Sequence, residues 1–324
     1  MRRRSFLTGV AALTMVHCAR ASAQSKMPLV GVMLATPVAG PFAAAFRQGL
    51  KDLGYADGKN IRLELRSAEG RPERFAQMAA ELVRLKPDVI VAGGGAPGIQ
   101  AARRATNTIP IVFPAGGDPV TEGYVQSLAR PGGNITGLSI LESEINIKRV
   151  QVLRELMPKV QRIALLIDPL GGVAAQQIGT VQRAASELGL ELQVLTGTTP
   201  DAFEAGLQSV RRERAEALIV AASSTFSAHR KRLIDLVARE KIITVWEHRE
   251  FPLSGGLLSY GPDIADLYRT AARYVDRILR GAKAGDLPVE QASKLELVIN
   301  LPTAKALGLT IPGPLLVRAD QVIQ

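Results

Sequence analysis

The sequence predicts an α/β fold in which two doubly wound lobes of parallel β-sheet are joined by crossover segments. The first observation is an internal repeat: residues 28–113 read strand, helix, strand, helix, strand, helix, strand, and residues 160–246 repeat that order. The second is that "DVIVAGG" (88–94) corresponds to "ALIVAAS" (217–223). The third is length, because 324 residues suffice for two cores of roughly 150 residues each. Two facing lobes predict a cleft that binds a small molecule.

The first half opens with "LVGVML" (29–34), a short, wholly apolar run typical of a strand covered on both faces. Helix 41–53 follows, with Phe42, Phe46 and Leu50 on one stripe and Gly54 as its C-terminal stop. The other predicted strands of this half are 60–68, 88–92, 109–113 and 134–140, and the other predicted helices are 72–86, 97–105 and 119–129. Strands that alternate with amphipathic helices indicate parallel βαβ units with right-handed crossovers.

The second half repeats this scheme. Its predicted strands are 162–167, 190–195, 217–221 and 242–246, and its predicted helices are 173–188, 201–213 and 226–240. A tail then adds strand 256–260, the long helix 263–280, and a strand with a short helix in "KLELVINLPTAKALGL". The tail fits neither repeat, so we expect it to complete both lobes. The expected chain crossings lie near 139–142, 250–255 and 284–290.

Residues 1–23 have the features of an export signal. Arg2, Arg3 and Arg4 form a basic start, the apolar stretch that follows is too short to span a bilayer, and "ASA" before Gln24 is a small-residue cleavage site. We expect cleavage after Ala23. "RRSFL" (3–7) is compatible with the twin-arginine route, and an ordinary secretory signal is the alternative.

Composition narrows the function classes. The net charge of +10 falls to +6 once the four arginines of the signal are removed, and the remaining Lys and Arg alternate with acids along predicted helices. This pattern favours a solvated surface over a nucleic-acid footprint. Cys18 is the only cysteine and lies within the signal, so the mature chain has no disulfide and no thiol nucleophile. No later stretch reads as a transmembrane helix.

Six loops follow the carboxyl ends of the predicted strands, which is where open parallel sheets bind ligands. They are 35–41, 93–97 and 114–119 in the first half, and 168–173, 222–226 and 247–251 in the second. Gly, Pro, Ser and Thr dominate them, and such residues let backbone N–H groups at helix N-termini approach an anion such as a carboxylate. "GGGAP" (93–97) and "SST" (223–225) are the best candidates. The alternative is that these residues only form tight βα turns.

Four acids stand at predicted strand ends and are candidates to pair with a ligand ammonium: Asp118, Asp168, Glu247 and Asp263. Helix capping is the alternative and is favoured for Asp263, which opens the long helix. His248 lies in a cleft loop, whereas His229 is expected on a helix surface. These two histidines have no metal-ligand spacing. Trp246 and Tyr260 are candidates to stack on a ligand, with core filling as the alternative for Trp246.

"GGGAPG" (93–98) matches the dinucleotide-binding pattern G-x-G-x-x-G and raises the hypothesis of a nicotinamide-dependent enzyme. The motif follows the third strand of its half instead of the first, and Asp118 lies five residues past its strand. A phosphate-binding P-loop is excluded, because Ile99 and Gln100 stand where Lys and Ser or Thr are needed. No G-x-S-x-G and no Ser-His-Asp order is present. We therefore expect no enzyme and no cofactor.

Three long segments resemble one family. "GGDPVTEGYVQSLARPGGNITGLS" (116–139), residues 255–312 and residues 53–83 are similar to the ABC-transporter substrate-binding family that includes tryptophan- and tyrosine-type binding proteins. The resemblance runs from about residue 28 to the end. It implies a type I periplasmic-binding-protein fold, known as a Venus flytrap. The sequence departs from the family's pattern at Ile167-Asp168-Pro169, where many relatives read Trp-Asn-Pro. It departs again at 94–96, which offers backbone amides but no side-chain hydroxyl.

The resemblance implies a set of ligand-binding residues within the six loops and on the strand beside them. The set is Thr36, Pro37, Gly94, Gly95, Ala96, Pro97, Gly117, Asp118, Asp168, Leu170, Gly171, Ser223, Ser224, Trp246, Glu247, His248 and Tyr260. The expected chain crossings divide the sequence into two lobes: 24–140 plus 255–284 form the first, and 141–254 plus 285–324 form the second.

The function implied is that of a periplasmic solute-binding protein, which captures a small metabolite with a carboxylate and delivers it to an ABC permease of the inner membrane. We expect a monomer that binds an amino acid or aromatic acid and no nucleic acid. A ligand-sensing input domain for a membrane receptor is the alternative, and a nicotinamide-dependent oxidoreductase is a further one. The ligand is expected to bridge both lobes and so to stabilise the closed state.

Overall fold

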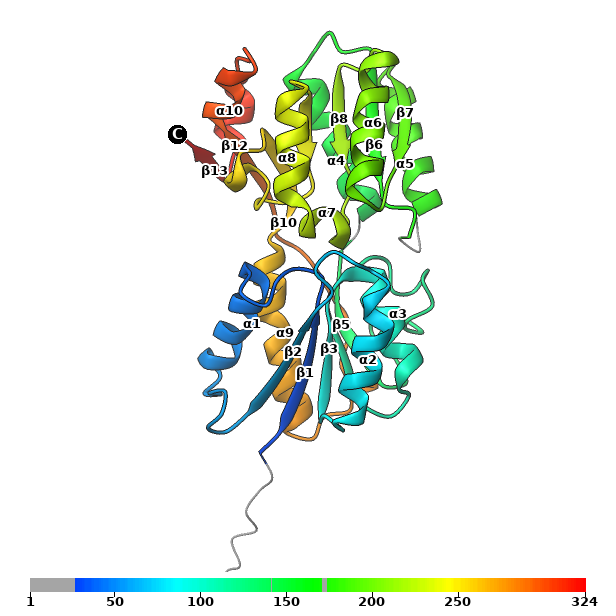
Figure 1. Ribbon diagram of the computed structural model, residues 1–324, viewed down its shortest axis with the longest axis vertical. Helices are drawn as coiled ribbons and strands as arrows, with labels where there is room; N and C mark the ends of the chain where they lie inside the picture. The colour runs from blue at the N-terminus through cyan, green and yellow to red at the C-terminus, as the bar shows by residue number, and fades with distance from the viewer. Residues whose placement is uncertain (1–26, 141, 171–173) are drawn as a thin grey trace, which may run out of the picture.

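The structure is a computed structural model that describes residues 27–140, 142–170 and 174–324. It consists of two α/β lobes stacked along the long axis of the molecule, each a mostly parallel sheet with helices on both faces (Figure 1). This confirms the predicted fold class. The expected signal, with Cys18 in it, lies outside the described residues, as does the candidate Gly171.

Lobe 1 is built on a six-stranded sheet in the order β11-β5-β4-β3-β1-β2, in which every neighbouring pair is parallel. Its strands are β1 (Leu29–Leu34), β2 (Arg62–Ser67), β3 (Val89–Ala92), β4 (Ile111–Gly116), β5 (Ile135–Ser139) and β11 (Glu290–Gln291). Five of them come from the first half of the chain, and the tail supplies the edge strand β11. The wholly apolar β1 is buried along its full length, as its composition predicts.

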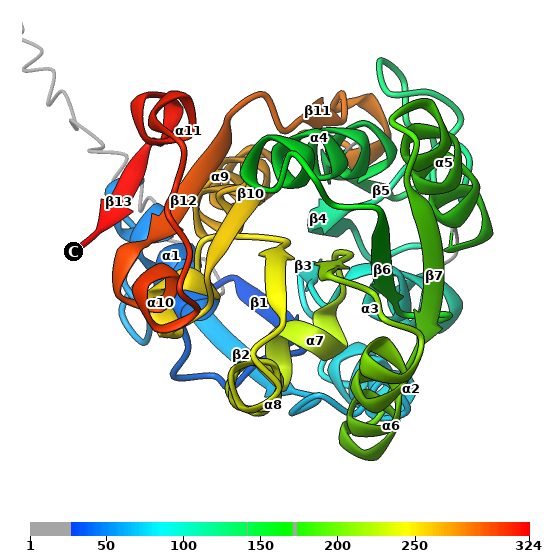
Figure 2. The ribbon, with the colours of Figure 1, turned by 90° about the horizontal axis from the view of Figure 1, so that it is seen from above.

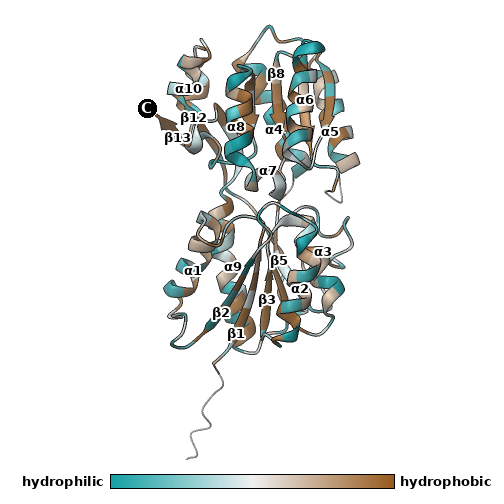
Figure 3. Cartoon of the chain, in the orientation of Figure 1, coloured by the Kyte–Doolittle hydropathy of each residue, from teal (hydrophilic) through white to brown (hydrophobic). Residues whose placement is uncertain are grey.

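The helices of lobe 1 are α1 (Pro41–Asp52), α2 (Arg74–Arg84), α3 (Gly95–Ala105) and α9 (Ile264–Leu279), with a 3₁₀ turn at Ala284–Asp286. Helices α1 and α9 pack side by side on one face of the sheet and share a core that contains Phe46 and Val275. Helices α2 and α3 cover the other face around Phe75 and Ile99. Figure 3 shows the hydrophobic strands lying between helices whose outer faces are hydrophilic.

Lobe 2 is built on a seven-stranded sheet in the order β13-β12-β10-β9-β8-β6-β7, in which only the β10–β12 pair is antiparallel. Its strands are β6 (Arg162–Ile167), β7 (Glu191–Thr196), β8 (Ala217–Val220), β9 (Ile243–Trp246), β10 (Leu258–Pro262), β12 (Leu295–Asn300) and β13 (Gln321–Ile323). The tail therefore contributes three strands to this lobe, and the antiparallel pair marks where it reverses direction.

Helices cover both faces of this sheet as well. They are α4 (Glu142–Leu156), α5 (Ala174–Glu187), α6 (Pro200–Arg212), α7 (Ser224–Ala228), α8 (Arg230–Arg239), α10 (Leu301–Ala306) and α11 (Gly313–Arg318), with a 3₁₀ turn at Pro252–Ser254. One core joins α4, α5, α10 and α11 to the sheet around Leu153 and Val181. The other joins α6, α7 and α8 around Phe203 and Phe226.

The sequence repeat is a structural repeat. The strands of the first half lie in the order β2-β1-β3-β4, and those of the second half lie in the matching order β7-β6-β8-β9. In each sheet the direction of winding changes between the first and third strands, so the loops after β1 and β3, and those after β6 and β8, diverge there. Such a switch point opens a crevice for a ligand. Seen from above, α7 of lobe 2 lies over the strands of lobe 1 (Figure 2).

The chain crosses between the lobes three times, and two of the crossings differ from the expected positions. The first, between β5 and α4, lies where it was predicted. The second lies at 262–264 instead of 250–255, because β10 pairs with β9 and β12 in the lobe 2 sheet. The third lies at 291–295 instead of 284–290, because β11 pairs with β5. Strands β10 and β11 thus belong to the opposite sheets from those expected.

Three helix predictions also need correction. Residues 119–129 form turns, not a helix: Asp118 caps a first turn by accepting the amides of Val120 and Thr121, but Gly123 ends it with a φ of +67°. Helix α4 was not predicted, although its first turn carries Glu142 and Glu144. The expected helix 226–240 is divided at His229 into α7 and α8.

Candidate functional site

A cavity of about 150 Å³ lies between the lobes, and all six predicted loops contribute residues to it. Ala35, Thr36, Gly94 to Pro97 and Ala115 to Gly117 line it from lobe 1, and Asp168, Ala222 to Ser224, Glu247 and His248 line it from lobe 2. Both switch points open into the same space. An enclosed apolar cavity of this volume in a protein core holds a benzene-sized guest, so the site has the size of a single small metabolite.

In the lobe 1 wall of the cavity, the backbone passes close to the Phe75 ring. Gly94 precedes α3 with a φ of +91°, and a Cβ atom there would lie 2.2 Å from Cζ of Phe75. Only glycine fits, and the first turn of α3 thereby presents its amides to the cavity. Beside them lies Thr36, which is buried and whose Oγ1 has no hydrogen-bond partner among the described residues. Free amides and an unpaired hydroxyl make this wall suited to an anionic oxygen.

An aromatic wall joins the two lobes. Phe42 at the start of α1 stacks on Tyr268 of α9, with ring centroids 5.3 Å apart and planes 10° apart. The edge of Phe42 also meets the imidazole of His248 in lobe 2 at 6.0 Å. Burial raises the pKa of Tyr268, so its phenol is neutral. This wall gives a ligand an apolar surface on the side where the lobes touch.

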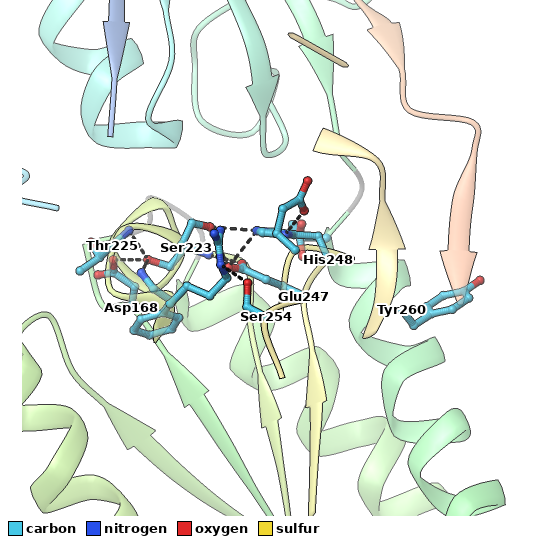
Figure 4. A network of polar contacts seen from close by, with 12 residues as sticks. Asp168, Ser223, Thr225, Glu247, His248, Ser254 and Tyr260 are labelled. Carbon is cyan, nitrogen blue, oxygen red and sulfur yellow. Dashed lines mark hydrogen bonds and ion pairs between the residues drawn. The ribbon is translucent and has the colours of Figure 1, made fainter. Parts of the chain in front are cut away.

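The lobe 2 wall is polar. Ser223 caps α7, and its hydroxyl accepts the amides of Thr225 and Phe226 while it donates to Oδ2 of Asp168 at 2.7 Å. Oδ1 of Asp168 accepts the amide of Leu170 at 2.9 Å. These contacts hold the Asp168 carboxylate, which is 8% exposed, at the cavity wall (Figure 4).

Glu247 and His248 lie side by side in the same wall (Figure 4), and together with Glu250 they form a buried cluster of charges. The Glu247 carboxylate accepts the amide of Ser223 at 2.6 Å and the hydroxyl of Ser227 at 3.0 Å. His248 Nδ1 lies 2.6 Å from Glu250, and its Nε2 lies 2.9 Å from the Ser227 hydroxyl and 3.4 Å from Glu247. These hydrogen bonds and ion pairs hold the loop after β9 in one conformation.

The two carboxylates keep the imidazole protonated. Burial alone lowers the pKa of His248, but the negative charges of Glu247 and Glu250 outweigh burial and raise the pKa to about 9. Burial raises the pKa of Glu250, yet the hydrogen bond and charge of His248 leave that pKa below its ordinary value. The site therefore holds a fixed imidazolium and no free imidazole base at neutral pH.

Arg149 of α4 contacts both a loop that lines the cavity and the segments where the chain crosses between the lobes. Its fully buried guanidinium donates to the carbonyls of Tyr260 at 2.8 Å and Glu247 at 2.9 Å, and it pairs with the Glu142 carboxylate at 3.2 Å. Glu142 follows the first crossover, and Tyr260 precedes the second. Burial raises the pKa of Glu142 despite the neighbouring Arg149. One side chain thus connects the binding loop to two of the three connections between the lobes.

Most of the sequence-predicted site residues meet at this cavity. Those that line it are Thr36, Gly94, Gly95, Ala96, Pro97, Gly117, Asp168, Ser223, Ser224, Glu247 and His248. They come from loops that lie far apart in the sequence but share the facing edges of the two sheets.

Five other candidates lie elsewhere. Trp246 is in the lobe 2 core, stacked on Phe251 at 4.5 Å, so the core-filling interpretation applies. Asp118 caps its own loop. Burial raises the pKa of its carboxyl group, but the hydrogen bonds that it accepts from two amides and a hydroxyl outweigh burial and leave the pKa below its ordinary value. Pro37 is exposed in a turn, and Leu170 is 51% exposed. Tyr260 packs between the two cores and points away from the charge network (Figure 4).

Sequence reasoning missed several lining residues. They are Phe42, Glu122, Ile140, Glu142, Gln177, Ser227, Ile264 and Tyr268, whereas the other lining residues Ala35, Ala115, Gly116 and Ala222 lie within the predicted loops. Phe42 and Ser227 lie within the first turns of helices that follow predicted loops, which is a usable signal. Tyr268 and Ile264 belong to α9, whose place beside α1 no local pattern indicates.

Among the described residues, no cluster of three or more His, Cys, Asp or Glu side chains has the arrangement of a metal site. No helix within the same ranges combines the length and apolarity needed to cross a bilayer. The "GGGAPG" motif follows β3 of lobe 1, and its glycines serve close packing, since a Cβ atom at Gly98 would lie 1.9 Å from the Gly93 carbonyl.

Comparison with known proteins gives consistent results. A family model described as ABC transporter substrate binding protein matches residues 30–323. A tyrosine-binding protein from Clostridioides difficile (strain R20291) is 29% identical over 266 residues, which is 82% of this chain and 75% of that protein.

Two solved structures are also similar. A conserved domain protein from Vibrio cholerae O1 biovar El Tor superposes with a TM-score of 0.84 at 31% identity, covering 92% of this chain and 100% of that one. The ABC domain from Streptococcus pneumoniae in complex with L-Trp superposes with a TM-score of 0.83 at 26% identity, covering 91% of this chain and 99% of that one.

Proposed function

This chain belongs to the ABC transporter substrate-binding protein family, and we propose that it captures a small metabolite bearing a carboxylate and delivers it to an ABC permease. Its relatives are substrate-binding proteins, so it is a binding protein and not an enzyme. We further propose that it acts as a monomer in the periplasm, after export and cleavage following Ala23.

The observation that carries the proposal is the interlobe cavity, to which all six strand-end loops contribute. A ligand there contacts both lobes only when they are closed, so its binding free energy favours the closed state. The permease would then distinguish loaded from empty protein by the relative position of the lobes.

The lobe 1 wall supports a carboxylate on the ligand. The amides of Gly95 and Ala96 begin an eleven-residue helix, and the unpaired Thr36 hydroxyl lies beside them. The aromatic wall of Phe42 and Tyr268 supports an apolar or aromatic body. The tyrosine-binding relative and the L-Trp complex make an amino acid or an aromatic acid the first class to test.

The test is a thermal-shift and calorimetric screen of the mature protein with amino acids, aromatic acids and short carboxylates. We expect at least one compound to raise Tm, because a ligand at a hundred times its Kd stabilises the folded state by about 2.7 kcal/mol. Stimulation of the permease ATPase in nanodiscs by the loaded protein tests delivery. Turnover of a compound, or no stabilisation by any compound of the panel, would contradict the proposal.

A further inference from the structure

The wall of the cavity is acidic. The carboxylates of Glu122, Glu142, Asp168 and Glu247 line it, and no Lys or Arg side chain stands among the described lining residues. The one cation among these lining residues is the protonated His248, which already faces Glu247 and Glu250. A ligand that carried only negative charge would therefore meet an unfavourable field, however well its carboxylate suited the helix amides.

Two of these carboxylates already pair with a cation, and a third is not fully buried. Glu142 pairs with Arg149 at 3.2 Å. Glu247 lies 3.4 Å from the protonated His248, as well as accepting two hydrogen bonds. Glu122 accepts a hydrogen bond from the neutral Tyr124 at 2.6 Å and is only half-buried, so water solvates its carboxylate.

Asp168 is different. It is buried, yet its partners are the neutral hydroxyl of Ser223 and the neutral amide of Leu170. No ion pair in the described ranges includes it. A buried carboxylate without a cation is unfavourable, and its charge is most simply balanced by a group that enters the cavity.

The opposite wall supplies an independent observation. Thr36 of lobe 1 is 6% exposed and lines the same cavity, and its buried hydroxyl has no partner among the described residues. The site thus has a buried carboxylate without a cationic partner on lobe 2 and an unpaired neutral hydroxyl on lobe 1. A molecule with a cation at one end and a hydrogen-bonding or anionic group at the other would satisfy both.

We propose that the ligand carries a protonated amine that pairs with Asp168, so that Asp168 selects ammonium-bearing ligands and orients them with the ammonium toward lobe 2. This inference rests on the proposed binding function and adds the chemical class of the ligand. A carboxylic acid that lacks the amine binds weakly even where it fits the cavity, because the negative charge of Asp168 then has no cationic partner.

The first experiment uses matched probes that differ only in their charged groups. L-Leucine is compared with 4-methylpentanoate and 3-methylbutylamine, and L-phenylalanine with 3-phenylpropanoate and 2-phenylethylamine, by calorimetry on the mature protein. In parallel, the molecule released from the purified protein is identified by mass spectrometry. We expect a basic nitrogen in the released molecule, and binding at least tenfold tighter for an amine-bearing probe than for its counterpart without the amine.

The second experiment uses Asp168→Asn, which keeps the shape and can accept the Leu170 amide. We expect binding of the amine-bearing ligand to fall at least tenfold. Without ligand, the Tm of this variant should equal or exceed that of the wild type, because an uncompensated charge has been removed. If Asp168 had only a structural role, the substitution would lower Tm. Asp118→Asn, which changes a strand-end acid outside the cavity, is the matched control and should leave binding unchanged.

A released ligand without a basic nitrogen, unchanged binding by Asp168→Asn, or equal stabilisation by calcium or zinc chloride alone would overturn the inference while the binding function stood. If no small molecule is released and no probe binds to the wild-type protein, the proposed function fails together with it.

Discussion

Gly70 of lobe 1 packs against His229 of lobe 2. A Cβ atom added at Gly70 would lie 2.7 Å from Nε2 of His229 and 3.0 Å from Cβ of Ala228. His229 stands at the break between α7 and α8. The contact is therefore present only when the lobes are closed, and it leaves no room for a side chain.

Gly70→Ala should hinder closure. Gly70 has a φ of +76°, and Gly58 has the same φ. Because nothing lies within 4 Å of the Cβ position at Gly58, Gly58→Ala is a control that has the same backbone strain without the steric contact. We expect both variants to lose about 1 kcal/mol of unfolding free energy. Only Gly70→Ala should also bind ligand about tenfold more weakly and show a larger ligand-bound radius of gyration by X-ray scattering. Equal affinities would refute the contact's role in closure.

Gly94 and Gly95 give a second matched pair. Both have positive φ, but a Cβ atom at Gly94 would meet Phe75 whereas one at Gly95 meets nothing within 4 Å. Chemical denaturation should show a loss of about 3 kcal/mol for Gly94→Ala and about 1 kcal/mol for Gly95→Ala, because only the first adds overpacking to backbone strain. Similar losses would mean that the Phe75 ring moves aside.

The protonated His248 should make stability depend on pH. Its pKa is raised from 6.5 to about 9 in the folded state, so its stabilisation is fully present below pH 6.5 and is lost as the pH rises through 9. A shift of this size corresponds to about 3 kcal/mol. Urea unfolding between pH 6 and pH 10 should show this decline in the wild type and a flatter profile in His248→Gln.

Glu250 gives the opposite dependence in acid. Its lowered pKa means that its stabilisation is present above its ordinary pKa of 4.5 and is lost as the pH falls through the folded-state value. Parallel wild-type and His248→Gln profiles from pH 4 to pH 10 would show that the imidazole is not held protonated.

Arg149→Met should destabilise the protein by about 3–5 kcal/mol, because it leaves Glu142 buried without its cation and two carbonyls without a donor. The double variant with Glu142→Gln should recover part of this loss in denaturant unfolding. The control is Lys231→Met, which breaks an exposed pair with Asp235 and should change stability by less than about 1 kcal/mol. Additive losses in the double variant would disprove the coupling.

Local patterns predicted much of the fold, and the failures have identifiable causes. The apolar run 29–34 and the stripe of Phe42, Phe46 and Leu50 became β1 and α1, because burial and periodicity act over a few residues. The expected helix 119–129 failed because Gly123 adopts a φ of +67°, which ends the chain's first turn after Asp118 has capped it. The crossings moved because the pairing partners of β10 and β11 lie far away in the sequence.

The candidate site was predictable in its loops but not in all its side chains. Trp246 ends a strand at the cleft edge, yet its ring lies on the sheet face covered by α6 to α8, among Phe226 and Phe251. Tyr268 reaches the cavity because α9 packs beside α1, although the two helices are more than two hundred residues apart.

The sequence by itself determined the duplicated α/β units and the polar, glycine-rich turns at their strand ends, because hydrophobic periodicity and turn chemistry are local properties. Only the tertiary structure decided which of those turns face each other, which acid is left without a cation, and where Arg149 joins the crossovers. Those outcomes depend on strand pairing and lobe orientation, which are set by contacts between residues far apart in the chain.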